Sequence, residues 1–259
     1  MRQNNNKDVN IVLTIIERES FKELKGKSLI VGFPGMAFVG KAVADVLINK
    51  LSLKEIAEIY SYEAPASIIV DNGRMTLPSI KIFSSPNVDV AVLTASYQPQ
   101  SEEAQNRLAH EILRKLSDAG IKMVISAAAY VSPEAPEKRR VFVAATEERL
   151  VEEFVANGCV PMDGGISGLN GLLPAIAEVY GIDGVALLGE TGELFVAGGL
   201  VDYYSATEVI RVLSSYLRLN VSLDDIIEKA KEVEESIRKA IARSAESEEK
   251  RGGEPFTHM

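Results

Sequence analysis

The sequence predicts an α/β protein in which a mostly parallel central sheet is covered by helices on both faces. Short apolar runs alternate along the chain with segments whose apolar residues recur every three or four positions. Glycines stand between several of these runs and the helices that follow them. With 259 residues, 46% of them hydrophobic, the chain can bury one large core, and no linker-like composition interrupts it before the tail.

Four regions follow from composition and periodicity. The polar, Asn-rich residues 1–8 are expected to be disordered, and residues 9–221 are expected to form the α/β domain. A charged C-terminal helix is expected over 222–249, followed by a disordered tail over 250–259.

The first predicted unit is a strand, a glycine turn and a helix. Residues 27–33 read KSLIVGF, an apolar run typical of a buried strand. One helical face is then predicted from Met36, Val39, Val43, Val46 and Leu47.

The remaining elements follow the same alternation. A hairpin is expected from strands 67–71 and 77–83, joined through Asp71-Asn72-Gly73. Further strands are expected over 88–95, 121–127, 141–145 and 184–188. Helices are expected over 102–118 with a stop at Gly120, 147–156 after the cap Thr146, 167–180, and 205–219.

Charge and cysteine content narrow the partners and the compartment. The net charge of -9, from 28 Lys+Arg and 37 Asp+Glu, opposes binding to a phosphate backbone, so no nucleic-acid partner is expected. The single cysteine, Cys159, cannot form an internal disulfide, which favours a reducing cytoplasm. No apolar leader and no run of about 20 apolar residues is present, so no membrane partner is expected.

One segment resembles a phosphate-binding loop. Residues 35–41 fit the pattern G-x4-G-K between a predicted strand and a helix. However, Ala42 stands where a hydroxyl would hold Mg²⁺. The alternative is that Gly32, Gly35 and Gly40 permit a tight turn and close packing of helix on strand.

A second glycine-rich segment, residues 163–171, opens a predicted helix. It could present backbone N–H groups to an anion, or Ser167 could simply cap the helix. Glu190 after a strand could also pair with Asp163. The candidate anion site is Gly35, Gly40, Lys41, Ser167 and Asn170.

Catalytic and metal chemistry have little sequence support. The two histidines, His110 and His258, are isolated, and no zinc-ligand spacing occurs. We therefore expect no catalytic residues, no metal and no cofactor.

The predicted C-terminal helix carries a narrow apolar seam. Its members alternate steps of four and three, as in a coiled coil: Ile226, Ala230, Val233, Ile237 and Ile241. The alternative is a helix that lies on its own domain. Candidate partner-binding residues are Ile226, Val233, Ile237, Ile241 and, in the tail, Phe256.

Taken together, the segments resemble the proteasome assembly chaperone family, in its second-chaperone branch with archaeal relatives. The resemblance rests on four motifs: Leu29 to Gly35 with Val39-Gly40, Gln98-Pro99, Ile166 to Leu173, and Leu187 to Thr191. It runs from about Leu29 to about Leu223.

The resemblance implies a three-layer α/β/α fold similar to nucleoside phosphorylases, homo-oligomerisation, and ATP-independent binding to proteasome α-subunits. Many relatives end in a hydrophobic residue, a tyrosine and one final residue, whereas this chain ends in Thr257-His258-Met259. Relatives also carry Pro-Asp-Pro where this chain has residues 201–204, VDYY.

The preferred hypothesis is accordingly a non-enzymatic, oligomeric assembly factor. One alternative is an enzyme on a phosphorylase-like fold that binds a phosphate or nucleoside at a glycine-rich elbow. Another is a scaffold without a proteasome link, assembled through the C-terminal seam.

Overall fold

The computed structural model describes residues 13–19 and 21–252, and its centre is a nine-stranded sheet. The strands are β1 (Leu13–Glu17), β2 (Ser28–Gly32), β3 (Lys54–Ser61), β4 (Ile69–Asp71), β5 (Arg74–Thr76), β6 (Ile80–Ser84), β7 (Val90–Ala95), β8 (Met123–Ser132), β9 (Val141–Ala145), β10 (Val160–Pro161) and β11 (Asp183–Gly192). The α-helices are α1 (Val39–Lys50), α2 (Glu102–Ala119), α3 (Glu148–Ala156), α4 (Leu169–Ala177), α5 (Glu193–Ala197), α6 (Tyr203–Leu217) and α7 (Asp224–Gly252). Short 3₁₀ turns are η1 (Phe21–Leu24), η2 (Met36–Phe38) and η3 (Glu178–Tyr180).

The sheet has the order β1-β3-β6-β7-β2-β8-β11-β9-β10. Its four central strands, β7, β2, β8 and β11, run parallel, whereas β1, β3 and β6 pair antiparallel on one flank and β9 pairs antiparallel with β11 on the other. All five residues of β2 are buried, as expected for a strand covered on both faces.

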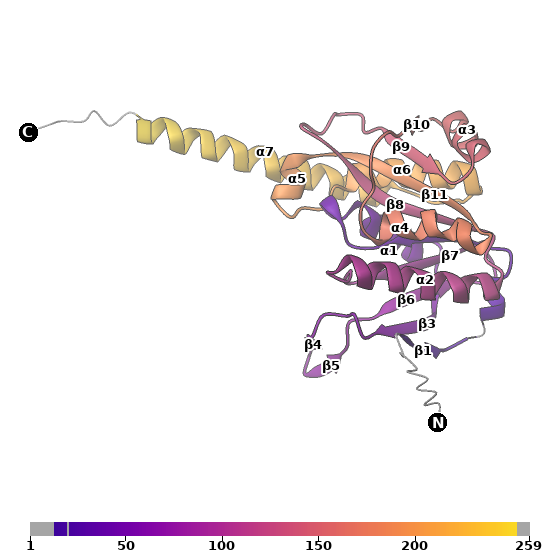
Figure 1. Cartoon of the computed structure of the whole chain (residues 1–259). Coiled ribbons are helices and arrows are strands. Elements are labelled where there is room, and N and C mark those ends of the chain that lie inside the picture. The colour runs from indigo at the N-terminus through magenta and orange to yellow at the C-terminus, as the bar shows by residue number, and fades with distance from the viewer. Residues whose placement is uncertain (1–12, 20, 253–259) are drawn as a thin grey trace, which may run out of the picture.

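Two apolar cores lie on opposite faces of this sheet. One packs α1, α3, α6 and the start of α7 against it, and the other packs α2 and α4 (Figure 1). In β2, Ile30 belongs to the first core, whereas Leu29 and Val31 belong to the second. The predicted three-layer α/β/α fold is confirmed.

Several local predictions need correction. The turn at Asn72 and Gly73, both at positive φ, is confirmed, but the second hairpin strand is β5, and β6 joins the main sheet instead. The helix expected from Met36 begins as η2, and α1 starts only at Val39. The hydroxyl of Thr146 does not cap α3 but accepts from the Gly184 N–H at 3.1 Å.

Strand β3 was not predicted, because two glutamates obscure its apolar pattern. Glu55 and Glu58 interrupt the apolar pattern of this strand, and both pair with Arg18 and Lys81 on neighbouring segments. The C-terminal helix predicted over 222–249 corresponds to α7, which continues to Gly252. The expected disorder of residues 1–8 lies outside the described residues. Of the tail expected over 250–259, residues 250–252 belong to α7, and the rest lies outside the described residues.

Candidate functional site

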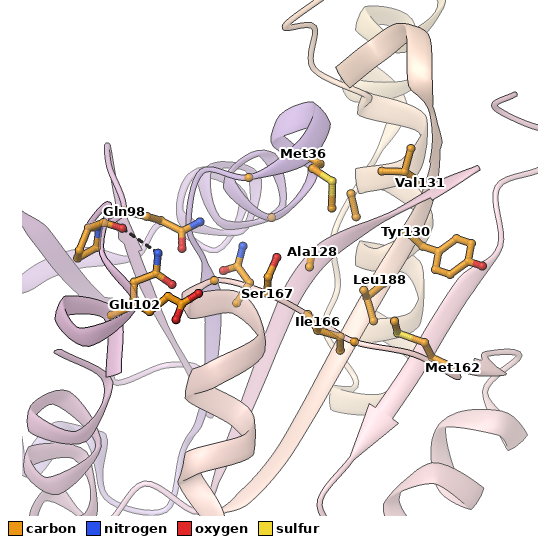
Figure 2. Close-up of a pocket in the computed structure, with 18 of the residues that line it drawn as sticks. Met36, Gln98, Glu102, Ala128, Tyr130, Val131, Met162, Ile166, Ser167 and Leu188 are labelled. Atoms are coloured by element: carbon orange, nitrogen blue, oxygen red, sulfur yellow. Dashed lines mark hydrogen bonds between the residues drawn. The ribbon is translucent and has the colours of Figure 1, made fainter. Parts of the chain in front are cut away.

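A cavity of about 710 Å³ opens at the carboxyl end of the parallel strands (Figure 2). Among these strands, β7 follows β2 in the chain and lies on one side of it, whereas β8 and β11 lie on the other side. The chain therefore changes direction between β2 and β8, which is where open α/β sheets hold their ligands. Gly35 and Met36 after β2, Gln98 after β7 and Ala128 on β8 all line the cavity, which we call the elbow cavity.

Two side-chain amides hold the walls of the elbow cavity together. Asn170, only 4% exposed, accepts a hydrogen bond from the Phe33 N–H at 2.9 Å and donates one to the Phe33 carbonyl at 3.1 Å. Gln98 donates to the Pro34 carbonyl and accepts from the Leu169 N–H at 2.8 Å. The loops after β2 and β7 are thus tied to the start of α4.

Glycines allow α1 to lie close against the sheet. A Cβ at Gly40 would meet the Ala127 carbonyl oxygen at 2.2 Å, and one at Gly32 would meet the Gly40 oxygen at 2.1 Å. These contacts support the packing interpretation of both glycines. Beside them, Ala37 and Phe38 have φ of 48° and 50°, a left-handed conformation that strains residues other than glycine.

The predicted anion site is only partly assembled. Gly35, Gly40, Ser167 and Asn170 all line the elbow cavity, as predicted neighbours should. Lys41 does not: its ammonium pairs with Asp45 one turn along α1, in a separate hollow.

The start of α4 differs from the prediction as well. Ser167 is not the cap; Gly168, at φ 80°, takes that position without a side-chain hydrogen bond. The N–H of Leu169 bonds to Gln98, and those of Gly171 and Leu172 bond to the Gly168 carbonyl. These donors are therefore already occupied by the chain itself.

The charges of the elbow cavity do not favour an anion. Its lining contains two carboxylates, Glu102 and Asp163, and no Lys, Arg or His. Binding of a phosphate at these elbows stays a prediction without a cationic group to support it. Across residues 13–19 and 21–252, no three His, Cys, Asp or Glu side chains gather as a metal site would require.

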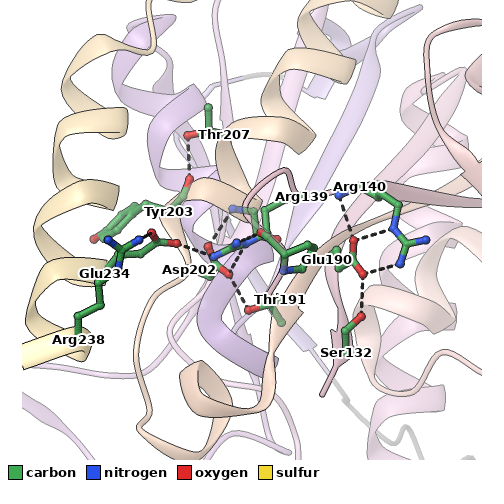
Figure 3. Close-up of polar contacts among 12 residues, drawn as sticks. Ser132, Arg139, Arg140, Glu190, Thr191, Asp202, Tyr203, Thr207, Glu234 and Arg238 are labelled. Atoms are coloured by element: carbon green, nitrogen blue, oxygen red, sulfur yellow. Dashed lines mark hydrogen bonds and ion pairs between the residues drawn. The ribbon is translucent and has the colours of Figure 1, made fainter. Parts of the chain in front are cut away.

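Glu190 has a structural partner in place of the predicted one. Glu190 is 1% exposed, and its carboxylate contacts Arg140 at 2.6 and 2.8 Å and the Ser132 hydroxyl at 2.7 Å (Figure 3). The predicted pair with Asp163 is not formed. The hydrogen bonds from Arg140 lower the pKa of Glu190 to about 2. The carboxylate stays ionised and does not serve as a proton donor near neutral pH.

A buried arginine ties α7 to the domain. The Arg139 side chain is 2% exposed, and its guanidinium contacts Asp202 at 3.2 Å and Glu234 of α7 at 2.8 Å (Figure 3). Asp202 also accepts from the Thr191 hydroxyl at 2.8 Å and from the Ser205 N–H at 2.9 Å. The sequence gives no signal for this network, because Arg139 stands in a charged run, EKRR, that is typical of an exposed loop.

The first half of the predicted seam covers the protein's own core. Ile226 is buried, and Val233 and Ile237 are half-buried against the α1 and α6 side of the sheet. Ile226 is therefore not free to bind a partner, and the prediction of packing on the domain holds for this half. The side chain of Ile241 and the whole of Phe256 lie outside the described residues.

A different apolar surface, which the sequence analysis did not single out, is exposed. The β4–β5 hairpin and its flanks present large apolar side chains to solvent, namely Ile68, Ile69, Val70, Met75 and Leu77. Met75 is the most exposed of these, at 70%. We call this set the hairpin surface. Figure 1 shows the hairpin and the protruding end of α7 on the same side of the molecule.

The cysteine and His110 have unremarkable surroundings. Cys159 is buried, and burial raises the pKa of its thiol to about 11, which opposes a nucleophilic role. The exposed His110 contacts the Tyr180 hydroxyl at 2.9 Å. Within the described part of the chain, no helix has the length and apolar character that a bilayer span requires.

Comparisons with known proteins agree with this architecture. The PAC2 family model matches residues 29–241. The structure of Pyrococcus furiosus PbaB, an archaeal proteasome activator, is 28% identical, with 88% of this chain and 98% of that chain covered at a TM-score of 0.80. Pyrococcus furiosus PbaA, an archaeal homolog of proteasome-assembly chaperone, is 25% identical, covering 93% and 96% of the two chains at a TM-score of 0.75.

A sequence relative extends the comparison to an uncharacterized protein of Methanocaldococcus jannaschii, MJ1210. It is 26% identical over 235 residues, which cover 88% of this chain and 89% of that protein. The family model spans most of the domain, including both glycine-rich segments, 35–41 and 163–171, and the first part of α7. The chain therefore belongs to the PAC2 family.

Proposed function

We propose that this protein is a non-enzymatic, ATP-independent factor that forms homo-oligomers in the cytoplasm and binds proteasome α-subunits. The observation that carries the proposal is the similarity over nearly the whole chain to PbaB, an archaeal proteasome activator, and to PbaA, a homolog of proteasome-assembly chaperone. In both cases the shared fold is accompanied by sequence identity, 28% for PbaB and 25% for PbaA.

Two features of the surface suit a protein-binding role. The hairpin surface exposes large apolar side chains from one hairpin and its flanks, and exposed apolar patches commonly mark interaction sites. The helix α7 is held at its base by Arg139 and extends beyond the globular body (Figure 1). A helix with a fixed base and a projecting end suits contact with a partner or with a sister subunit.

The site chemistry is consistent with binding in place of catalysis. The carboxylate of Glu190 is ion-paired with Arg140, and the ammonium of Lys41 is ion-paired with Asp45. The free cysteine, Cys159, is buried. The strained residues Ala37 and Phe38 lie at the elbow, but no nucleophile and base are paired beside them in the described lining.

The proposal is tested with purified protein and purified archaeal proteasome α-subunits. Multi-angle light scattering gives the oligomer mass, and pull-down on immobilised α-subunits gives the interaction. We expect an oligomer and retention on the α-subunits. A strictly monomeric protein that is not retained would contradict the proposal.

Two variants and one matched control separate the two surfaces. Met75→Ser removes an exposed apolar side chain of the hairpin surface, whereas Leu194→Ser makes the same kind of change on α5, where Leu194 is 58% exposed. Truncation after residue 240 removes the end of α7 but keeps Arg139, Glu234 and Ile237. Loss of binding on truncation alone would assign the interaction to the end of α7, and loss on Met75→Ser alone to the hairpin surface.

A further inference from the structure

The turn η2 holds two residues in a conformation that strains side chains other than glycine. Ala37 has φ 48° and ψ 20°, and Phe38 has φ 50° and ψ 21°. Residues keep such a conformation only where the surrounding structure holds them in it. A relaxed, right-handed conformation is therefore available to η2 whenever those surroundings loosen.

Two contacts hold Ala37 in place. The residue is 3% exposed, and its methyl group packs in the core on the α1 and α6 side of the sheet. Its carbonyl accepts a hydrogen bond from the Asp202 N–H at 3.0 Å. Asp202 is the N-cap residue of α6, so a distant segment of the chain helps to fix the turn.

The buried carboxylate of Asp202 fixes the position of that residue. Its side chain is 0% exposed, and it pairs with the Arg139 guanidinium at 3.2 Å. The carboxylate also accepts from the Thr191 hydroxyl and from the Ser205 N–H. A buried charge that loses its counter-charge is costly, so Asp202 and Arg139 are expected to move together.

Arg139 is held in turn by α7. Its guanidinium donates to the Pro136 carbonyl and, at 2.8 Å, to the carboxylate of Glu234 (Figure 3). Glu234 lies about two helical turns beyond Ile226, the buried residue at the base of α7. A continuous series of polar contacts thus joins α7 to η2, through Glu234, Arg139, Asp202 and Ala37.

The turn η2 also forms part of the wall of the elbow cavity. Gly35 and Met36 line this cavity, and Met36 is 49% exposed. The Phe38 N–H donates to the Gly35 carbonyl at 3.0 Å. A change of conformation at Ala37 would therefore displace the wall on both sides of it.

We propose that Asp202 couples the attachment of α7 to the conformation of η2. With α7 in place, Arg139 holds Asp202, and Asp202 holds the left-handed turn. When a partner draws the base of α7 away from Arg139, the turn relaxes and the wall of the elbow cavity at Met36 changes. By linkage, a contact that fixes η2 also favours the attached α7. This coupling belongs to the chain alone and does not depend on the proposed interaction with the proteasome.

Removal of the Glu234 carboxylate in the full chain tests the coupling. Hydrogen exchange of Glu234→Ala is followed by mass spectrometry over residues 35–38, over 200–204 and over α3, which makes no contact in the series. We expect exchange over 35–38 and 200–204 to be at least about fivefold faster than in the wild type, with α3 within about twofold. Unchanged exchange over 35–38 would overturn the proposal. So would an equal acceleration over α3, because it would report a general loss of stability.

Glu235→Ala is the matched control on the same helix. Glu235 pairs with Lys239 of α7 itself, so its loss should leave exchange over 35–38 within about twofold of the wild type. An effect of Glu235→Ala as large as that of Glu234→Ala would overturn the role of Arg139.

The methionine signals report the cavity wall directly. With methyl-labelled methionine, Glu234→Ala should shift the NMR signal of Met36 and leave that of Met75, on the hairpin surface, in place. A Met36 signal identical to that of the wild type would contradict the proposal.

Discussion

Substitution of Gly40 by alanine tests whether the elbow glycines serve close packing. The added Cβ would lie 2.2 Å from the Ala127 carbonyl oxygen and 3.2 Å from the Asn170 amide nitrogen. An ordinary contact of carbon with oxygen needs about 3.3 Å, so α1 must move away from β8 by about 1 Å. Overpacking of this kind costs about 1–3 kcal/mol, and the rigid backbone of a central strand favours the upper part of that range.

The net effect includes one favourable contribution. Alanine is a better helix former than glycine by up to about 1 kcal/mol, which offsets part of the steric cost. We therefore expect Gly40→Ala to lower the free energy of unfolding by about 2 kcal/mol and the melting temperature by about 4–8 °C. Urea unfolding followed by circular dichroism measures the first quantity, and thermal unfolding measures the second.

Gly165→Ala, in the second glycine-rich segment (residues 163–171), is the matched control. A Cβ at Gly165 meets nothing within 4 Å, and Gly165 is not among the residues at positive φ. This variant should keep the wild-type stability within about 0.5 kcal/mol or gain slightly. If Gly40→Ala proved as stable as Gly165→Ala, the packing explanation of the first elbow would be refuted.

Three further substitutions test buried polar contacts. Glu190 has its pKa lowered from 4.5 to about 2 by Arg140 in the folded state, so its contribution is present above about pH 4.5 and lost as the pH falls toward 2. Solvent screens the pair because Arg140 is 56% exposed, so we expect this contribution to be about 2 kcal/mol. In the Glu190→Gln variant, the free energy of unfolding should fall by about 2 kcal/mol less than in the wild type as the pH is lowered from 4.5 toward 2. Asn170→Ala leaves a buried backbone N–H and carbonyl unpaired and should cost about 2–4 kcal/mol in urea unfolding, unlike Asn87→Ala at an exposed position. Arg139→Ala leaves the buried carboxylate of Asp202 without its counter-charge, so we expect the free energy of unfolding to fall by about 3–5 kcal/mol. Adding Asp202→Asn should recover part of this loss. Wild-type stability of Arg139→Ala would exclude a structural role for the pair.

Local signals in the sequence were sufficient for much of the fold. The apolar run of β2, the spacing of apolar residues in α2 and the stop at Gly120, which has φ 80°, all appear in the structure as predicted. These features depend on residues within one element, where periodicity and glycine chemistry act directly.

Contacts between distant residues explain the predictions that failed. Ser167 has the ordinary residue type of a cap, but the Leu169 N–H is satisfied by Gln98, 71 positions away in the chain. Likewise, the buried Arg139 pairs with Asp202 and with Glu234 of α7, which lie 63 and 95 positions away in the chain. No local pattern records either contact.

The candidate site was predictable in its location but not in its charge. The two glycine-rich segments were singled out separately, and the structure brings Gly35, Gly40, Ser167 and Asn170 to one cavity. The ammonium of Lys41 pairs with Asp45, one turn along α1, and lines a separate hollow. The acidic residues Glu102 and Asp163, which the motifs did not indicate together, line the cavity instead.

Sedimentation velocity of the full chain mixed with a purified archaeal proteasome α-ring tests whether the protein binds α-subunits without ATP. We expect the protein to sediment with the ring, and equally well with and without ATP. A protein that sediments alone at every concentration, or that joins the ring only when ATP is present, would contradict it.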